Sequence, residues 1–225
     1  MGQGDGDGVD APEQRRDLAL VTRAQRGDRQ AFNALVERHQ SAAYALAMRM
    51  VGDPDVAADV TQDAFFSAYR AIASFRGSSF RAWLLRIVSN GCFDHFRAQG
   101  RRPTVSLEAT LEADRDDEGA SADARLPKSL IEQAWEPERI VLRAETIERI
   151  QQSLLKLVPE QRLALILSDI QGLPYDEIAR VMDCSLGTVK SRIFRARAHL
   201  RAILTREGEL YSAPPRPSHE TSSTE

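Results

Sequence analysis

Apolar residues recur at every third or fourth position along most of the chain, which is the spacing of one face of an α-helix. A first helix is expected between the N-cap residue Asp28 and Gly52, with an inner face made by Phe32, Leu35, Val36, Ala43, Leu46, Ala47 and Met50. Asp53-Pro54 predicts the start of a second helix, and a third is expected from near Phe80 to about residue 97. No stretch alternates apolar and polar residues as a strand does, so the pattern predicts an all-α fold.

Helical spacing returns in the C-terminal third of the chain. Apolar stripes on both sides of Pro159 are followed by a short helix whose inner face holds Ile178, Ala179 and Met182. After a turn, a longer helix begins near Leu186, with an inner face made by Val189, Ile193, Ala196 and Leu200. Ser185 is placed to cap this second helix by accepting a hydrogen bond from a backbone N–H near Thr188. The segment therefore predicts a helix-turn-helix.

The outer face of the second helix carries the most informative residues. At about 100° per residue, Lys190, Ser191, Phe194, Arg195 and Arg201 lie opposite the apolar stripe. A phenyl ring among cations is unusual on a solvated face. In a DNA major groove, however, it can contact a thymine methyl while Arg and Lys contact guanine edges and phosphates. The arc indicates a DNA-reading helix, although spacing alone leaves open a small helical hairpin with a solvated basic face.

Charge is segregated along the 225 residues, which are 42% hydrophobic and 28% charged with a formal net charge of -3. Residues 103–138 hold ten acidic side chains against three basic ones. They predict an extended acidic linker between two small helical domains. The expected segments are a disordered tail at 1–16, a first domain at 17–102, the linker at 103–138, a second domain at 139–204 and a disordered tail at 205–225.

Composition also limits the classes of function. The two cysteines, Cys92 and Cys184, lie far apart and show no metal-ligand spacing, so no metal, disulfide or cofactor is expected. No apolar run approaches the ~20 residues of a membrane span, and a cytoplasmic protein without direct membrane insertion is expected. Cys92, Asp94 and His95 could suggest a thiol nucleophile with a base. They lack a glycine-rich loop or an oxyanion arrangement, and we expect no enzyme.

Two motifs in the first domain resemble the second conserved region of bacterial sigma factors. They are Asp59-Val60-Thr61-Gln62-Asp63-Ala64-Phe65 and Phe75-Arg76-Gly77-Ser78-Ser79-Phe80-Arg81-Ala82-Trp83-Leu84, followed by Asn90 and Asp94. The C-terminal helix-turn-helix resembles the fourth region. Their order and separation are similar to those of the extracytoplasmic-function group of the sigma-70 superfamily. The resemblance covers roughly residues 17–100 and 140–204.

This resemblance implies a dissociable RNA polymerase subunit that recognises two promoter elements and initiates transcription. It assigns binding to core polymerase, through the β′ coiled coil and the β subunit, to Asp59, Gln62, Asp63 and Phe66. It assigns recognition and melting of the minus-ten element to Phe75, Arg76, Ser78, Ser79, Asn90, Asp94 and Arg97. It assigns recognition of the minus-thirty-five element to Thr188, Lys190, Ser191, Phe194, Arg195 and Arg197.

Two further expectations follow from the resemblance. An anti-sigma factor, often anchored in the membrane, is expected to hold the protein inactive until a stress or envelope signal releases it. The acidic linker is expected to mimic RNA in the polymerase channels, and a self-repelling disordered spacer explains its charge equally well.

The family's dense arginine run is thinned to Arg97, Arg101 and Arg102, and Gly91 interrupts a helix. A conventional helix-turn-helix regulator that does not replace the sigma subunit remains the alternative.

Overall fold

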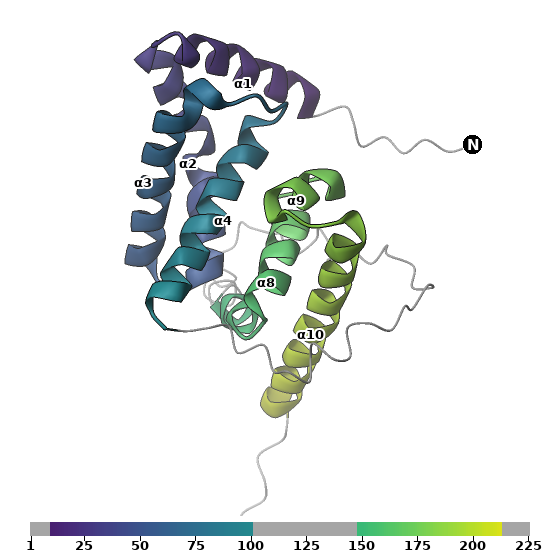
Figure 1. Cartoon of the computed structure of the whole chain (residues 1–225). Coiled ribbons are helices and arrows are strands. Elements are labelled where there is room, and N and C mark those ends of the chain that lie inside the picture. The colour runs from purple at the N-terminus through teal and green to yellow at the C-terminus, as the bar shows by residue number, and fades with distance from the viewer. Residues whose placement is uncertain (1–9, 101–147, 213–225) are drawn as a thin grey trace, which may run out of the picture.

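The structure is a computed structural model that describes residues 10–100 and 148–212, with side chains from 12 to 100 and from 148 to 206. These residues form helices and connecting turns without a strand, so the all-α prediction is confirmed for them (Figure 1). The expected acidic linker lies outside the described residues. The helices are α1 (Asp10–Gln25), α2 (Arg29–Val51), α3 (Pro54–Ala71), η1 (Ile72–Ser74), α4 (Phe80–Ala98), an unlabelled helix at 148–155, α8 (Pro159–Leu165), η2 (Ile166–Ile170), α9 (Tyr175–Met182) and α10 (Leu186–Ser212).

Local capping signals set the predicted helix ends. The Asp28 carboxylate accepts a hydrogen bond from the backbone N–H of Ala31 at 3.1 Å at the start of α2. Gly52 ends that helix in the left-handed region, with φ of 79°. The carboxylate of Asp53 caps α3, and the Ser185 hydroxyl accepts from the backbone N–H of Thr188 at 3.1 Å to cap α10.

Both ends of the described chain differ from the sequence prediction. Helix α1 begins at Asp10, inside the stretch expected to be a disordered tail, and the Gln14 side chain donates to the carbonyl oxygen of Ser78 at 3.0 Å. Helix α10 continues to Ser212, beyond the expected boundary at residue 204. Packing within the predicted domain supports both helices, because Val21 and Ala24 of α1 are buried in the core and Ile203 of α10 packs against a second apolar cluster.

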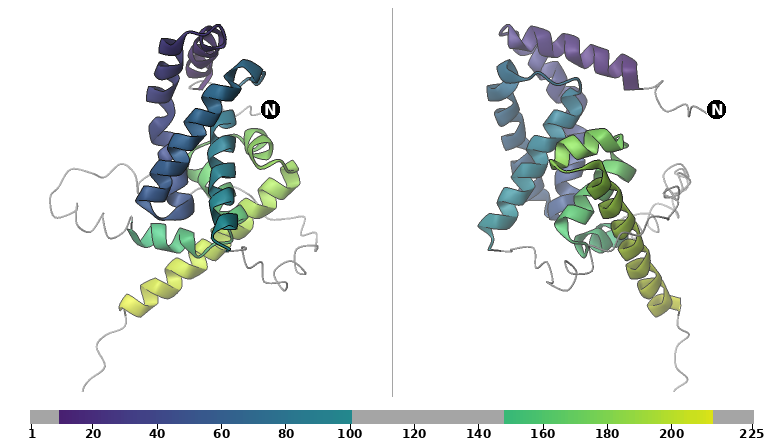
Figure 2. Two further views of the ribbon diagram at one scale, coloured as in Figure 1. Left: turned by 60° about the vertical axis from the view of Figure 1, so that its left-hand side comes forward. Right: turned by 45° about the vertical axis from the view of Figure 1, so that its right-hand side comes forward.

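Helices α2, α3 and α4 pack side by side, and α1 lies across one end of them (Figures 1 and 2). The close approach of α3 and α4 explains the glycine inside α4. A Cβ atom added to Gly91 would lie 3.1 Å from Cγ1 of Val60, which is tighter than ordinary contact. The helix cost of this glycine, about 1 kcal/mol, is therefore offset by closer packing between the two helices.

A buried ionic cluster ties α1 to α2. The Asp17 carboxylate accepts from Arg38 Nε at 2.9 Å and lies 2.8 Å from His39 Nε2. Burial opposes the charge of Asp17, but the hydrogen bonds and charges of His39 and Arg38 outweigh it, and the pKa of Asp17 falls below its ordinary value of 3.8.

Replacing the carboxylate by Asp17→Asn is expected to lower the free energy of unfolding at pH 7 by about 2 kcal/mol. Because the folded protein holds the pKa below 3.8, the stabilisation is present above that pH and disappears as the pH falls through the lowered value. Denaturant unfolding at pH 7 and below pH 3 measures the difference between the wild type and the variant. An equal difference at both pH values would contradict this role.

The two predicted domains pack against each other through a shared core. One continuous apolar cluster includes Leu35 and Leu84 from the first domain and Leu163, Ile178 and Val189 from the second. The sequence predicted two domains joined by a linker and gave no sign of this contact. Helix α9 thus packs against α4, and α8 and η2 contact α2, while α10 packs on the other side against α8 and α9 (Figure 1).

Arg162 reinforces the contact between the domains. Its guanidinium group is buried and donates to the backbone carbonyl of Met50 at the end of α2 and to those of Leu155 and Leu157, the latter at 3.0 Å. Burial lowers the pKa of Arg162 to about 10, so the side chain remains charged at neutral pH. A buried cation held by carbonyls at helix ends joins the start of α8 to the end of α2.

Candidate nucleic-acid interface

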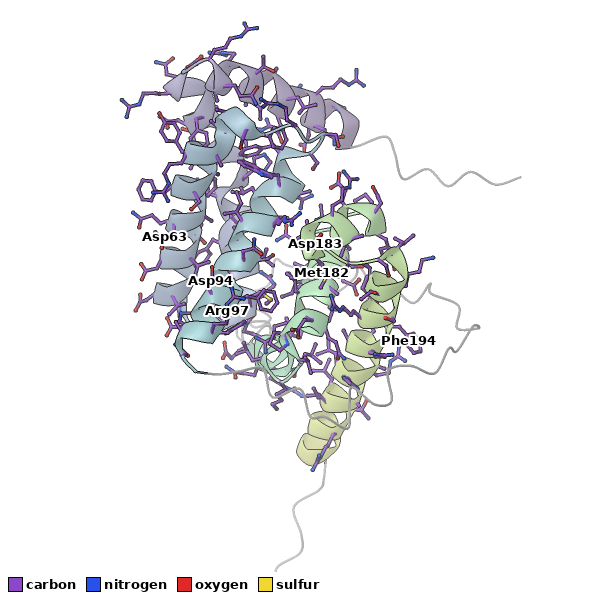
Figure 3. All side chains as sticks on the ribbon, in the orientation of Figure 1. Asp63, Asp94, Arg97, Met182, Asp183 and Phe194 are labelled. Carbon is purple, nitrogen blue, oxygen red and sulfur yellow. The ribbon has the colours of Figure 1, made fainter. Side chains whose placement is uncertain are left out.

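The expected polymerase-docking residues share one face of α3. Asp59 and Asp63 are four residues apart, as are Gln62 and Phe66, and all four are exposed, with 55% of Phe66 accessible to solvent. Figure 3 shows Asp63 on the outer side of α3, turned away from α9 and α10. The face combines carboxylates with an uncovered phenyl ring, which suits a basic protein partner.

An aromatic groove of about 730 Å³ lies beside this acidic face, between α2 and α3. Gln62 and Phe66 line it together with four further aromatic side chains, Phe32, Tyr44, Phe65 and Tyr69. Tyr44 is 39% exposed and Tyr69 is 45% exposed. The sequence reasoning missed both tyrosines, although the i+3 spacing of Tyr69 after Phe66 was a usable signal.

The loop between α3 and α4 holds its aromatic residue inward. Phe75 is only 5% exposed, and its ring packs against Trp83 and Phe80 at centroid distances of 5.1 and 6.2 Å. Gln25 Nε2 donates to the carbonyl oxygen of Phe75 at 3.0 Å, and Arg76 donates to the same oxygen at 2.8 Å. The Phe75 ring therefore anchors the loop and offers no free face for stacking on a base in this arrangement.

The other expected minus-ten residues lie on or beside α4. Ser78 and Asn90 are exposed. Asp94 and Arg97 form an exposed ion pair one turn apart (Figure 3). The Ser79 hydroxyl caps α4 by accepting from Ala82 N at 3.2 Å.

Ser79 also belongs to a polar contact between α4 and α9 that sequence reasoning missed. Its hydroxyl lies 3.4 Å from Oε2 of Glu177, whose pKa is raised by burial. Arg81 donates to the carbonyl and side-chain oxygens of Gln171 at 2.7 and 2.9 Å, and Gln171 Nε2 donates to the carbonyl oxygen of Ala42 at 3.0 Å. These bonds hold the second domain against the loop and helix expected to contact the minus-ten element.

A second polar contact lies further along the same two helices. Arg86 donates to the carbonyl oxygen of Arg180 at 3.2 Å and to the carboxylate of Asp183 at 3.4 Å. Asp183 follows α9 and lies on the side facing α4 (Figure 3). Pairs of this kind depend on how two domains meet, so hydrophobic periodicity within one helix cannot reveal them.

The helix-turn-helix leaves its predicted reading surface uncovered. Lys190 is exposed. Phe194 is 55% exposed and lies on the side of α10 that faces away from the first domain (Figure 3). The hydroxyl groups of Thr188 and Ser191 are engaged at the start of the helix, where Ser191 donates to the carbonyl oxygen of Thr188 at 3.0 Å. Arg195 is partly exposed.

Arg197 does not belong to this open surface. Its guanidinium group forms a two-point ion pair with Asp169, and the side chains are only 16% and 4% exposed. The hydrogen bond to Asp169 raises the pKa of Arg197. Arg197 therefore connects α10 to η2, instead of standing beside Lys190 and Phe194 as a free cation.

Cys92 does not have the environment of a nucleophile. It is fully buried, and burial raises its pKa to about 12, which keeps the thiol protonated at neutral pH. Among the described residues, no group of three His, Cys, Asp or Glu side chains could hold a metal ion. In the same ranges, no helix is both long and apolar enough to cross a membrane.

Family models match both halves of the chain. The model for sigma-70 region 2 matches residues 35–102, and the model for sigma-70 region 4 matches residues 147–200. The ECF RNA polymerase sigma-E factor of Escherichia coli (strain K12) is 42% identical over 186 residues, which cover 82% of this chain and 92% of that protein. The RNA polymerase sigma-H factor of Pseudomonas aeruginosa is 43% identical over 185 residues, covering 82% and 91%.

Two solved structures share this fold. CnrH in complex with the cytosolic domain of CnrY is 30% identical with a TM-score of 0.58, over 85% of this chain and 99% of that one. The sigma factor RpoE in complex with the anti-sigma factor NepR, from Bartonella quintana, is 26% identical with a TM-score of 0.56, over 77% and 96%. With both regions matched in order, this chain belongs to the ECF RNA polymerase sigma factors.

Proposed function

We propose that the chain recruits core RNA polymerase through α3, melts the minus-ten element with the loop at 74–79 and α4, and reads the minus-thirty-five element with α10. The observation that carries this proposal is the pair of exposed, chemically different faces on one chain. The face of α3 holds Asp59, Asp63 and Phe66, and the face of α10 holds Lys190 and Phe194. An acidic and aromatic face suits a basic protein, whereas a cationic and aromatic helix suits DNA.

In the proposed recognition of the minus-ten element, Phe75 supports the loop and does not stack on the base. Ser78, Asn90 and Arg97 are exposed and can reach DNA from the loop and from α4. Holding an unstacked base costs a few kcal/mol, which polar groups on a rigid loop can offset. Phe75 supports that loop from inside, through Trp83, and the base itself would be held by the exposed polar residues.

Binding both promoter elements requires the two domains to separate. Elements centred at minus ten and minus thirty-five lie about 25 base pairs apart, or about 85 Å at ~3.4 Å per base pair. Ser79 lies 3.4 Å from Glu177 in this structure. Even a fully extended chain from Glu177 to Lys190 would reach only about 47 Å. The compact arrangement therefore represents the protein before it binds a promoter.

We also propose that an anti-sigma factor controls the chain in the cytoplasm, in response to stress. The support comes from two solved relatives: CnrH is bound to the cytosolic domain of CnrY, and RpoE of Bartonella quintana is bound to the anti-sigma factor NepR. Membrane association would come only from an anchored anti-sigma factor. Co-purification with and without a membrane fraction tests this part separately.

Run-off transcription tests the proposed function. Core polymerase alone, the chain alone and the two together are compared on promoters selected from a random library. A promoter-specific transcript is expected only from the combination. A sequence-specific footprint by the chain alone, without any transcript from the combination, would support a conventional helix-turn-helix regulator instead.

Arg195→Ala is expected to reduce discrimination at one base pair of the minus-thirty-five element by about 1 to 3 kcal/mol, since an Arg on a base edge carries sequence information. Competition binding of the holoenzyme against single-base promoter variants measures this. Arg206→Ala serves as the control, because Arg206 is an exposed cation further along α10. Equal weakening on every sequence would reassign Arg195 to a phosphate contact.

A further inference from the structure

Asp169 forms a two-point ion pair with Arg197 of the recognition helix α10. Its Oδ1 accepts from Arg197 Nη2 at 2.7 Å and its Oδ2 accepts from Arg197 Nε at 3.1 Å. The Ser168 hydroxyl donates to Oδ1 at 2.8 Å. A two-point bond between a planar carboxylate and a planar guanidinium group fixes orientation as well as distance.

The backbone at Asp169 takes an unusual form. Residues 166–170 make η2, a π-helical turn, in which the N–H of Gln171 bonds to the carbonyl of Ile166 at 2.8 Å. Such a turn holds one residue more than an α-helical turn and redirects the side chains around it, and π turns are frequent at functional sites. Here Asp169 faces α10, while Gln171 faces α2 and α4 of the first domain.

The position of Arg197 on α10 links this pair to the reading surface. Arg197 follows Lys190 by seven residues, so the two lie only about 20° apart around the helix axis. Phe194 lies one turn before Arg197. Any rotation of α10 about its axis would move all three side chains together. A bond that fixes Arg197 therefore also fixes the directions of Lys190 and Phe194.

The apolar contacts of α10 constrain its rotation less strictly. Val189, Ile193, Ala196 and Leu200 are buried, and packing of this kind is non-directional. The ion pair adds a directional contact at the edge of the apolar stripe, in addition to the contact between His199 Nδ1 and Gln161 Oε1 at 3.0 Å further along α10. Its two members are almost fully covered, so screening by salt is weak.

We propose that Asp169 is a positioning residue for promoter recognition. It holds α10 in the rotation that presents Lys190 and Phe194 to the minus-thirty-five element, while making no contact with DNA itself. The inference rests on the proposed function of α10. It adds that discrimination between promoter sequences depends on the buried carboxylate of Asp169, which lies outside the reading surface.

The test uses Asp169→Asn in the full chain, reconstituted with core polymerase. Transcription is compared on a selected promoter, on the same promoter with a scrambled minus-thirty-five element, and on a template with a pre-melted minus-ten region and no minus-thirty-five element. Discrimination between the first two templates is expected to fall about tenfold, with the third unchanged. Asp176→Asn is the matched control, since Asp176 forms an exposed ion pair with Arg180 in the same domain.

Each other outcome has a definite meaning. Equal loss on all three templates would show that Asp169 only stabilises the fold, and would overturn the proposal. Stronger discrimination would show that Asp169 restrains a DNA-contacting Arg197, which also overturns it. If Asp169→Asn does not fold, as judged by its melting temperature, Arg197→Lys replaces it with the same expected result, because lysine keeps the charge and loses the two-point bond. A wild-type chain that gives no core-dependent transcript would contradict the proposed function itself.

Discussion

A chain cross-linked between α4 and α9 is expected to lose at least nine-tenths of its transcription from promoters that need both elements. The variant carries Arg86→Cys and Arg180→Cys in a Cys184→Ser background, joined by a short bis-maleimide with a cleavable disulfide. Arg86 donates to the carbonyl oxygen of Arg180, so these positions meet across the domain contact, and both are exposed. A fixed contact there cannot span the ~85 Å between the elements.

Cleavage of the cross-link supplies the internal control. Transcription is expected to return when the disulfide in the linker is reduced, because the chain itself is unchanged. The single variant Arg86→Cys, treated with the same reagent, controls for modification of α4. Full activity of the locked chain on a two-element promoter would contradict the opening of the domains, and would require this compact arrangement to engage DNA directly.

Reversal of charge on α3 is expected to weaken binding to core polymerase about 100-fold. The variant Asp59→Lys/Asp63→Lys places two cations on a face proposed to meet a basic coiled coil, and like charges across an interface cost several kcal/mol. Both side chains are exposed and lie beyond the first turn of α3, so the fold should lose little stability. Fluorescence titration of labelled chain with core polymerase measures the affinity.

A matched control separates a local effect from net charge. Glu13→Lys/Glu148→Lys makes the same change in charge at exposed positions on other helices. We expect it to bind core within about threefold of the wild type, since exposed charges outside a contact change association only modestly at physiological salt. Equal weakening by both variants would show that overall charge, and not the α3 face, governs binding. Phe66→Ala tests the apolar part of the same face.

Local signals predicted most helix ends, and distant contacts explain where prediction failed. Asp28, Gly52 and Ser185 act through bonds to backbone groups within four residues, which a sequence displays directly. The contacts that hold α1 in place are distant in sequence: Gln14 donates to Ser78, and Asp17 pairs with Arg38 and His39 of α2. No local motif marks the start of α1, and the polar composition before residue 17 pointed the other way.

The site residues show the same difference between features set by local sequence and features set by distant contacts. The faces of α3 and α10 were predicted because helical spacing alone brings their members together. The resemblance assigns Phe75 and Arg197 to DNA contacts. In the structure, however, the ring of Phe75 is covered by Trp83 and the side chain of Arg197 is held by Asp169. These two contacts depend on the geometry of the loop at Phe75 and of the π turn at Asp169. Neither geometry has a periodic pattern in the sequence. The contact between Arg81 and Gln171 joins residues 90 positions apart and depends on the docking of two domains.

Permanganate reactivity of thymines at the minus-ten element tests the central claim most directly, because it reports strand opening and not binding alone. The chain, core polymerase and their mixture are compared on one selected promoter and on the same promoter with a scrambled minus-thirty-five element. Reactive thymines are expected only with the mixture, and only on the intact promoter. Protection of duplex DNA by the chain alone, with no reactive thymines in any mixture, would contradict a sigma factor and identify a conventional regulator.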